Sequence, residues 1–187
     1  MFLRPIRLAQ AIVLAGVAAL IAVPAVLADT APATATVTGG ALTESTASTP
    51  SVSATLNGTN QTPTYTMAIA TNDRTGTGSG WNLTVTSTTF STGGGRPKTL
   101  SNTASQVTGA TSACAQGTCT DPTNSITYPL TLPAGATAPT AVKLFNAAVN
   151  TGMGDFTVTP TVGVTIPANA FAGTYTSTIT LAVASAP

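Results

Sequence analysis

The sequence predicts an all-β fold: an antiparallel β-sandwich in one domain that follows an N-terminal signal peptide. Short runs alternate apolar and polar residues and are separated by Gly, Pro, Asn and Ser, which is typical of strands and turns. Charged residues make up only 6% of the 187 residues, so hydroxyl groups carry most of the polarity, and abundant Thr and Val suit a pleated sheet. Outside the signal peptide no helical periodicity is sustained long enough to outweigh these runs.

Residues 1–28 have the pattern of a secretory signal peptide. Arg4 and Arg7 make the start positive, residues 11–23 form an unbroken apolar run, and a small residue, Ala28, precedes the expected cleavage site. An uncleaved membrane anchor is disfavoured because a proline follows the run and the apolar stretch is at the short end for a bilayer. We therefore expect a secreted, extracellular protein at the cell wall or cell surface, with no membrane contact after cleavage.

The predicted cleavage leaves 159 of the 187 residues, enough for a single domain. Of the six basic side chains two are removed, so four basic residues face five acidic ones and the formal charge becomes −1. This composition offers no basic patch for nucleic acid. We assign residues 29–45 to a flexible leader or a first strand and residues 46–187 to the β-sandwich domain.

The strand signals follow one another along this domain. The clearest places Trp81, Leu83 and Val85 on one face and Asn82, Thr84 and Thr86 on the other, as expected for a half-buried strand. Two segments, 91–98 and 109–124, are predicted loops that could carry a binding surface. In chain order, strand runs are predicted at 51–56, 64–70, 81–86, 126–132, 141–145, 156–166 and 175–183.

Cys114 and Cys119 are the only cysteines, and export would place them where a disulfide forms. The short loop that they close gives a predicted stabilisation of about 2 kcal/mol. A redox pair or half of a metal site is the alternative. With no second cysteine pair and no histidine to complete a metal site, a structural disulfide is favoured, and no metal or cofactor is expected.

The sequence argues against an enzyme. It contains no histidine to serve as a base, and the five acids after the signal peptide form no recognisable pair or motif. A glycosidase needs only two carboxylates, but it would have to draw them from scattered sites. A secreted glycan-acting enzyme is therefore the least favoured function.

Four residues are candidates for structural or binding roles that do not involve catalysis. Trp81, the only tryptophan, is interpreted first as a core residue and alternatively as a platform that stacks on sugar. Asp73 and Arg74 precede a Gly-rich turn and suggest a local ion pair or a turn anchor, which contributes little if exposed. Tyr175 is expected at a sheet corner, with its hydroxyl on a backbone carbonyl.

These residues also carry a resemblance to the WxL-domain family of bacterial cell-surface proteins. Trp81-Asn82-Leu83 fits the first WxL motif, and the preceding stretch from Asp73 to Gly80 resembles the acidic, Gly-rich approach of that family. Residues 173–187 are similar to its closing strand, in which a Tyr leads into a second WxL. Here Leu181 and Val183 stand where the family has its second Trp and Leu, so an aliphatic residue replaces an aromatic one.

The resemblance implies non-covalent attachment to peptidoglycan or another wall glycan, often within complexes that contain other surface proteins. It makes Trp81, Leu83, Asp73, Arg74 and Tyr175 candidate binding residues. A structural subunit of a surface layer or fibre, or an adhesin, is the alternative function, suggested by the low charge and the Thr-rich strands.

Overall fold

Two β-sheets make up most of the computed structural model, which describes residues 30–187. The signal peptide predicted for residues 1–28 lies outside the described residues. Residues 30–187 contain no helix, and so none that is long and apolar enough to cross a membrane. The strands belong to a unit that spans Val37–Pro187 and are β1 (Leu42–Ser45), β2 (Thr64–Thr66), β3 (Ile69–Asp73), β4 (Trp81–Thr88), β5 (Ser105–Thr120), β6 (Leu130–Thr131), β7 (Ala134–Gly135), β8 (Val142–Ala147), β9 (Met153–Val164) and β10 (Ile179–Ser185).

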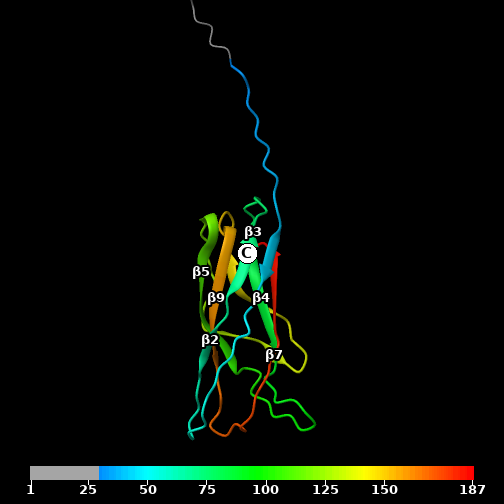
Figure 1. Cartoon of the computed structure of the whole chain (residues 1–187), viewed down its shortest axis with the longest axis vertical. Coiled ribbons are helices and arrows are strands. Elements are labelled where there is room, and N and C mark those ends of the chain that lie inside the picture. The colour runs from blue at the N-terminus through cyan, green and yellow to red at the C-terminus, as the bar shows by residue number, and fades with distance from the viewer. Residues whose placement is uncertain (1–29) are drawn as a thin grey trace, which may run out of the picture. The chain divides into compact units, whose positions relative to one another are not determined.

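The first sheet is ordered β1-β3-β9-β5-β6, and β2 also pairs with β9. Its long central strand, β9, is antiparallel to β2 and β3, which follow one another in register along it, and to β5. The second sheet is ordered β10-β4-β7, with β8 also paired to β4. All strand pairs are antiparallel except β4 with β7. The predicted all-β sandwich is thus confirmed (Figure 1).

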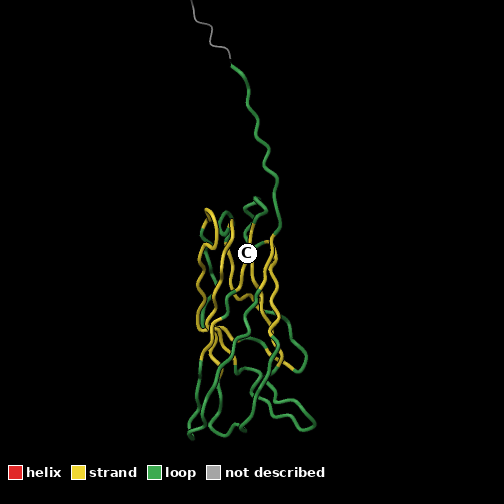
Figure 2. Tube along the Cα trace, in the orientation of Figure 1, coloured by secondary structure: helices red, strands yellow, loops and turns green. Residues whose placement is uncertain are grey.

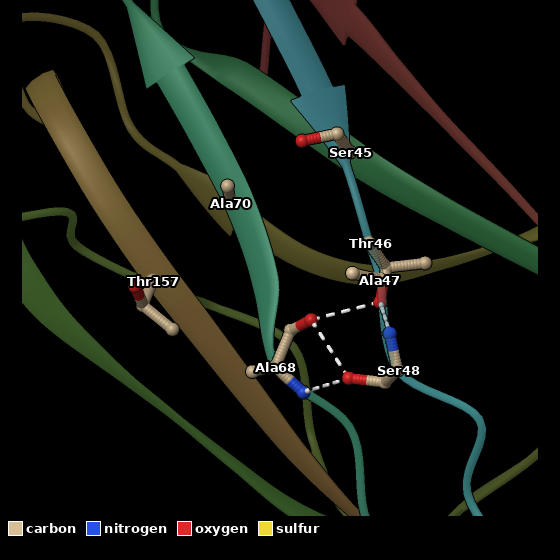
Figure 3. Close-up of a pocket in the computed structure, with 7 residues that line it drawn as sticks. All are labelled: Ser45, Thr46, Ala47, Ser48, Ala68, Ala70 and Thr157. Carbon is tan, nitrogen blue, oxygen red and sulfur yellow. Dashed lines mark hydrogen bonds between the residues drawn. The ribbon is translucent and has the colours of Figure 1, made fainter.

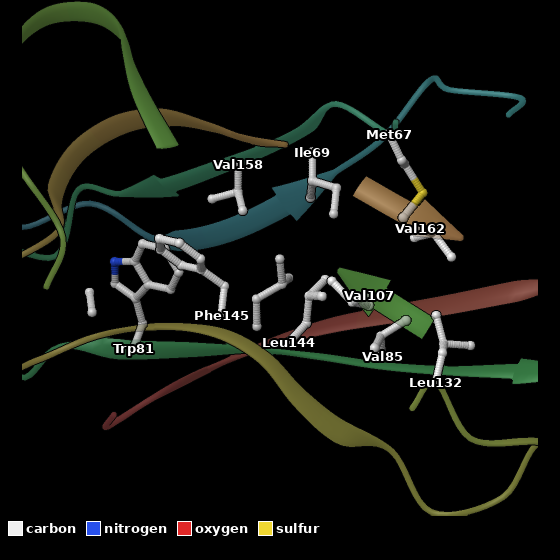
Figure 4. Close-up of a cluster of buried hydrophobic side chains, with 12 residues drawn as sticks. Met67, Ile69, Trp81, Val85, Val107, Leu132, Leu144, Phe145, Val158 and Val162 are labelled. Atoms are coloured by element: carbon white, nitrogen blue, oxygen red, sulfur yellow. The ribbon is translucent and has the colours of Figure 1, made fainter. Parts of the chain in front are cut away.

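The hydrophobic core lies between the two sheets. Trp81, Phe145 and Val85 from the second sheet face Ile69 and Val158 from the first, as Figure 4 shows. On β9, every second side chain from Phe156 onward is buried, because successive side chains of a strand point to opposite faces of the sheet. Leu100, Ala104 and Val164 form a smaller buried cluster that is separate from this main core.

Loops build the end of the sandwich next to this smaller cluster. Figure 2 shows that strands occupy one half of the unit and that loops form the other end. Isolated bridges join Gln61 to Ile166, and Ser91 to both Thr99 and Thr176. Three segments distant in sequence, near residues 50–63, 88–103 and 165–178, are therefore held together at this end (Figure 1).

Several local predictions were wrong. Segment 109–124 is not a loop over most of its length, because residues up to Thr120 belong to β5 and pair with β9. Its residues lack an apolar alternation since this strand is largely exposed on both faces. Conversely, segment 51–56 forms no strand, and in segment 126–132 only Leu130–Thr131 does.

Candidate functional site

Trp81 begins β4 and lies entirely inside the sandwich. Its side chain is 0% exposed, its ring stacks on Phe145 with centroids 5.9 Å apart, and its indole Nε1 donates a hydrogen bond of 2.9 Å to the Gly152 carbonyl. A buried indole N–H usually finds such a partner. The interpretation of Trp81 as a core residue therefore agrees with this structure, which exposes no face of the ring to a sugar.

The close approach of the indole leaves no room for a side chain at Gly152. Its φ is +71°, and an added Cβ would lie 2.7 Å from Trp81 Nε1 and would clash with the Ala147 side chain. Only glycine combines this left-handed conformation with so close an approach. The tight packing around Trp81 thus extends to the backbone of the turn that precedes β9.

The strands that carry the two motif regions lie side by side. In the pairing of β4 with β10, Leu83 is opposite Val183 and Val85 is opposite Leu181. Leu181 and Val183 are half-buried and pack on the same core cluster as Trp81 and Leu83. Hence the residues at both motifs contribute to one hydrophobic layer, and an aliphatic side chain at Leu181 preserves that packing.

Asp73 and Arg74 do not pair with each other. Asp73, which is 4% exposed, accepts hydrogen bonds from the Thr75 backbone N–H at 3.0 Å and from the Thr75 hydroxyl at 2.6 Å. It is therefore a turn anchor, one of the two roles predicted for it. The predicted local ion pair was wrong because the Arg74 side chain extends across to β9.

On β9, Asp155 is the partner of Arg74. The guanidinium donates from Nε to Oδ1 at 2.8 Å and from Nη2 to Oδ2 at 2.6 Å, a bidentate pair. The hydrogen bonds and positive charge of Arg74 hold the pKa of the Asp155 carboxyl below its ordinary value, against a smaller opposing effect of desolvation. This pair joins β3 to β9.

Two of the described acids have structural partners. Asp73 and Asp155 are engaged with Thr75 and Arg74, and residues 30–187 contain no cluster of three or more metal-ligating side chains. Cys114 and Cys119 form the predicted disulfide, which closes a bulge of β5 where that strand shifts register against β9.

A groove of about 1100 Å³ lies at the loop-built end of the sandwich. This is slightly above the range of about 300 to 1000 Å³ that is typical of ligand sites. Its apolar lining is shared with the smaller buried cluster and includes four of the eight aromatic residues in the described part of the chain: Tyr65, Phe90, Phe171 and Tyr175.

One wall of this groove is the extended segment 46–56, which supplies mostly hydroxyl groups. Six of its Ser and Thr residues line the groove, interleaved with Val52 and Leu56. Among the described residues, the backbone groups of 51–54 have no hydrogen-bond partner. Apart from the hydroxyls of Thr46 and Ser48, which bond to Ala68, this wall therefore presents hydroxyls, amide N–H groups and carbonyls that remain free to bind a ligand.

The opposite wall is the segment that leads into β10. The Tyr175 hydroxyl donates a hydrogen bond of 2.9 Å to the Phe171 carbonyl, as predicted for this tyrosine. Phe171 is 61% exposed, and the Lys98 ammonium lies 4.1 Å from the centre of its ring. The same wall continues to Leu181, so one residue of the second motif region also lines the groove.

A second hollow of about 420 Å³ lies beside β1 and β3 (Figure 3). Its lining contains only small residues, and two of its four hydroxyls are already engaged, since Thr46 and Ser48 both donate to the Ala68 carbonyl. This hollow has no aromatic surface and few free hydroxyls, so the larger groove is the better candidate site.

Of the predicted binding residues, only Tyr175 lies in the groove. Trp81 and Leu83 are in the core. Asp73 ends β3 and Arg74 follows it, whereas the groove-lining Met67 precedes the other end of this strand. Sequence reasoning missed Phe90 and Phe171. The signal for Phe171 was a single aromatic residue among the small residues of a loop.

Comparison with known proteins gives one match. A family model described as "WxL domain surface cell wall-binding" matches residues 33–187. No curated protein and no solved structure matches the chain.

Proposed function

Because this chain belongs to the WxL-domain family of surface proteins that bind the cell wall, we propose that it is secreted and held on peptidoglycan by non-covalent contacts alone. The observation that supports this mode of attachment is the groove at the loop-built end, which combines exposed aromatic surface with free hydroxyl and amide groups. The rigid sandwich holds the loops that form this surface.

The proposed role is non-catalytic. Two acids on the paired strands β3 and β9, Asp73 and Asp155, are engaged with Thr75 and Arg74. Neither lines the groove. Incubation of the protein with labelled peptidoglycan should therefore release no soluble sugar or peptide, whereas release that depends on Asp73 or Asp155 would indicate an enzyme.

The direct test is sedimentation with purified peptidoglycan. We expect the protein in the pellet, and we expect hot detergent to return all of it to the supernatant because no covalent bond is formed. Protein that stays in the supernatant before detergent treatment contradicts wall binding. Protein that resists detergent contradicts the non-covalent mode.

An open strand edge favours a second candidate function, assembly of copies into a surface layer or fibre. Beyond β9, β5 is covered only where β6 pairs with Gln106 and Val107, so its edge from Gly109 onward has no neighbouring strand among the described residues. This edge carries no charge and no proline, the two features that usually prevent strands from pairing between molecules.

Analytical ultracentrifugation at rising protein concentration tests this assembly. We expect oligomers from the unmodified protein and monomers from Ala113→Lys, which places a charge on the open edge. A matched Thr43→Lys variant, on the β1 edge of the same sheet, should leave β5-mediated assembly unchanged. A monodisperse unmodified protein at high concentration would contradict this second function.

A further inference from the structure

We infer that the groove binds the neutral, N-acetylated sugar strand of the wall and not its peptide stems. This inference rests on the proposed function and specifies the part of the polymer that is recognised. It is argued from the charge, the exposed apolar surface and the free polar groups of the groove.

Charge distinguishes the sugar strand from the stems. Among the described residues that line the groove, none is acidic or basic. The Lys98 ammonium lies over the Phe171 ring, but among the lining residues themselves a charged ligand group would lose water without gaining a counter-charge, which is costly. Peptide stems end in free carboxylates, whereas the sugars of the strand present hydroxyl and acetamido groups, and the lactyl carboxyl of every second sugar is neutralised by its amide bond to the stem. The uncharged lining therefore matches the sugar strand.

Exposed apolar surface gathers at the groove. Residues 30–187 have four large hydrophobic side chains that are clearly exposed, and two of them, Leu56 at 40% and Phe171 at 61%, lie at the groove. Lys98 lies over the ring of Phe171, yet most of that side chain remains accessible. An exposed aromatic ring can stack on the C–H face of a pyranose, and such exposed apolar surface commonly marks a binding site.

Polar groups are positioned for the acetamido and hydroxyl groups of the sugar. The unpaired backbone of residues 51–54 offers N–H donors and carbonyl acceptors along one wall. An acetamido group needs one donor and one acceptor, which is what each free peptide unit supplies. Ser51 and Ser53 add hydroxyls beside these units, and the length of the segment fits a chain of sugars better than one ring.

Titration calorimetry with the β-1,4-linked hexamer of N-acetylglucosamine tests the inference. The purified protein should bind the hexamer, and Phe171→Ala should weaken that binding about threefold to tenfold, the loss expected for one aromatic stack. Phe171→Tyr should restore it. Val149→Ala is the matched control, because Val149 is 58% exposed but lies outside the groove, and it should bind like the unmodified protein.

A second arm identifies the source of the sugar. Glycan strands freed from their stems by an amidase, with the lactyl carboxylates that this exposes converted to methyl esters, should compete with the hexamer, and isolated stem peptides should not. Wall material stripped of its attached polysaccharides should still bind, which assigns the ligand to peptidoglycan.

The outcomes separate the inference from the proposed function. Protein that sediments with peptidoglycan but binds neither the hexamer nor the freed strands overturns the inference and leaves the function standing. Binding of stem peptides alone, laid along residues 51–54 as an added strand, also overturns it. Equal affinities for Phe171→Ala and Val149→Ala would exclude the groove as the site, and failure to sediment with peptidoglycan would overturn both.

Discussion

Trp81 and Gly152 depend on each other in the core. The indole needs the Gly152 carbonyl as its hydrogen-bond acceptor, and the backbone of Gly152 approaches the ring so closely that a side chain does not fit. The tryptophan of the first motif therefore supports the fold directly, and any effect of its replacement on wall binding passes through stability.

Replacing this tryptophan should destabilise the protein strongly. Trp81→Ala removes the largest fully buried side chain, and we expect the free energy of unfolding in urea to fall by about 3 to 5 kcal/mol. Trp81→Phe should lose less because the ring is retained in part. A Trp81→Ala variant that unfolds like the unmodified protein would contradict the assignment of Trp81 to the core. A folded variant that loses wall binding would instead favour a role of Trp81 in contacting the ligand.

A substitution at Gly152 tests the same contact from the other side. Gly152→Ala should lower the free energy of unfolding by about 1 to 3 kcal/mol, since the new methyl group meets the indole in a strained conformation. Gly95→Ala serves as the control, because nothing lies within 4 Å of its added methyl group and its φ is not left-handed. Equal unfolding midpoints for the two variants would refute this explanation.

Between elements, the bidentate pair of Arg74 and Asp155 links β3 to β9. Arg74 lowers the pKa of Asp155 in the folded protein below its ordinary 3.8, so the folded state binds this proton less readily than the unfolded chain does. The pair therefore stabilises the fold above the unfolded pKa, and this contribution is lost as the pH falls through the folded pKa.

A pH series of thermal unfolding measures this contribution. The difference in melting temperature between the unmodified protein and Asp155→Asn should be constant above about pH 5 and should shrink as the pH falls below about 4. Asp121→Asn, at an exposed position, is the control for loss of a carboxylate. A difference that grows on acidification would have the wrong sign for a lowered pKa.

The strands that the sequence predicts well are those with one buried face. For β4, the alternation of Trp81, Leu83 and Val85 identifies the strand because these side chains enter the core. Segment 51–56 shows a similar alternation, but Val52 and Leu56 line a groove and the backbone pairs with no strand. Alternation reports which side chains face apolar surroundings, and it does not report strand pairing.

Two other features could not be predicted from the sequence, for different reasons. The length of β5 could not be predicted because residues 109–120 form strand pairs while remaining largely exposed, so no apolar pattern marks them. The groove could not be predicted because Tyr65, Phe90 and Phe171 come from three segments that meet only through the pairing of distant loops.

For the whole molecule, the scarcity of charge should make wall binding insensitive to salt. The groove has no charged lining, and the full chain has a formal net charge of only +1. The fraction of protein bound to peptidoglycan should therefore change little between about 0.05 M and about 1 M NaCl, a range over which charge attraction is largely screened. A steep loss of sedimentation with salt would show that Lys and Arg side chains hold the wall instead.

The pairing of β4 with β10 has a consequence for the time at which this protein folds. Thr84 and Ala182 are bonded across these strands although 98 positions separate them, and Asn82 likewise bonds the Ala186 carbonyl. Under the proposed secretion, a chain that emerges from a membrane channel amino end first holds β4 on the far side long before its partner strand arrives. Because contacts between distant residues slow folding, the tryptophan strand stays open on that side until almost the whole chain has crossed, and it is during this interval that the protein depends most on protection from aggregation.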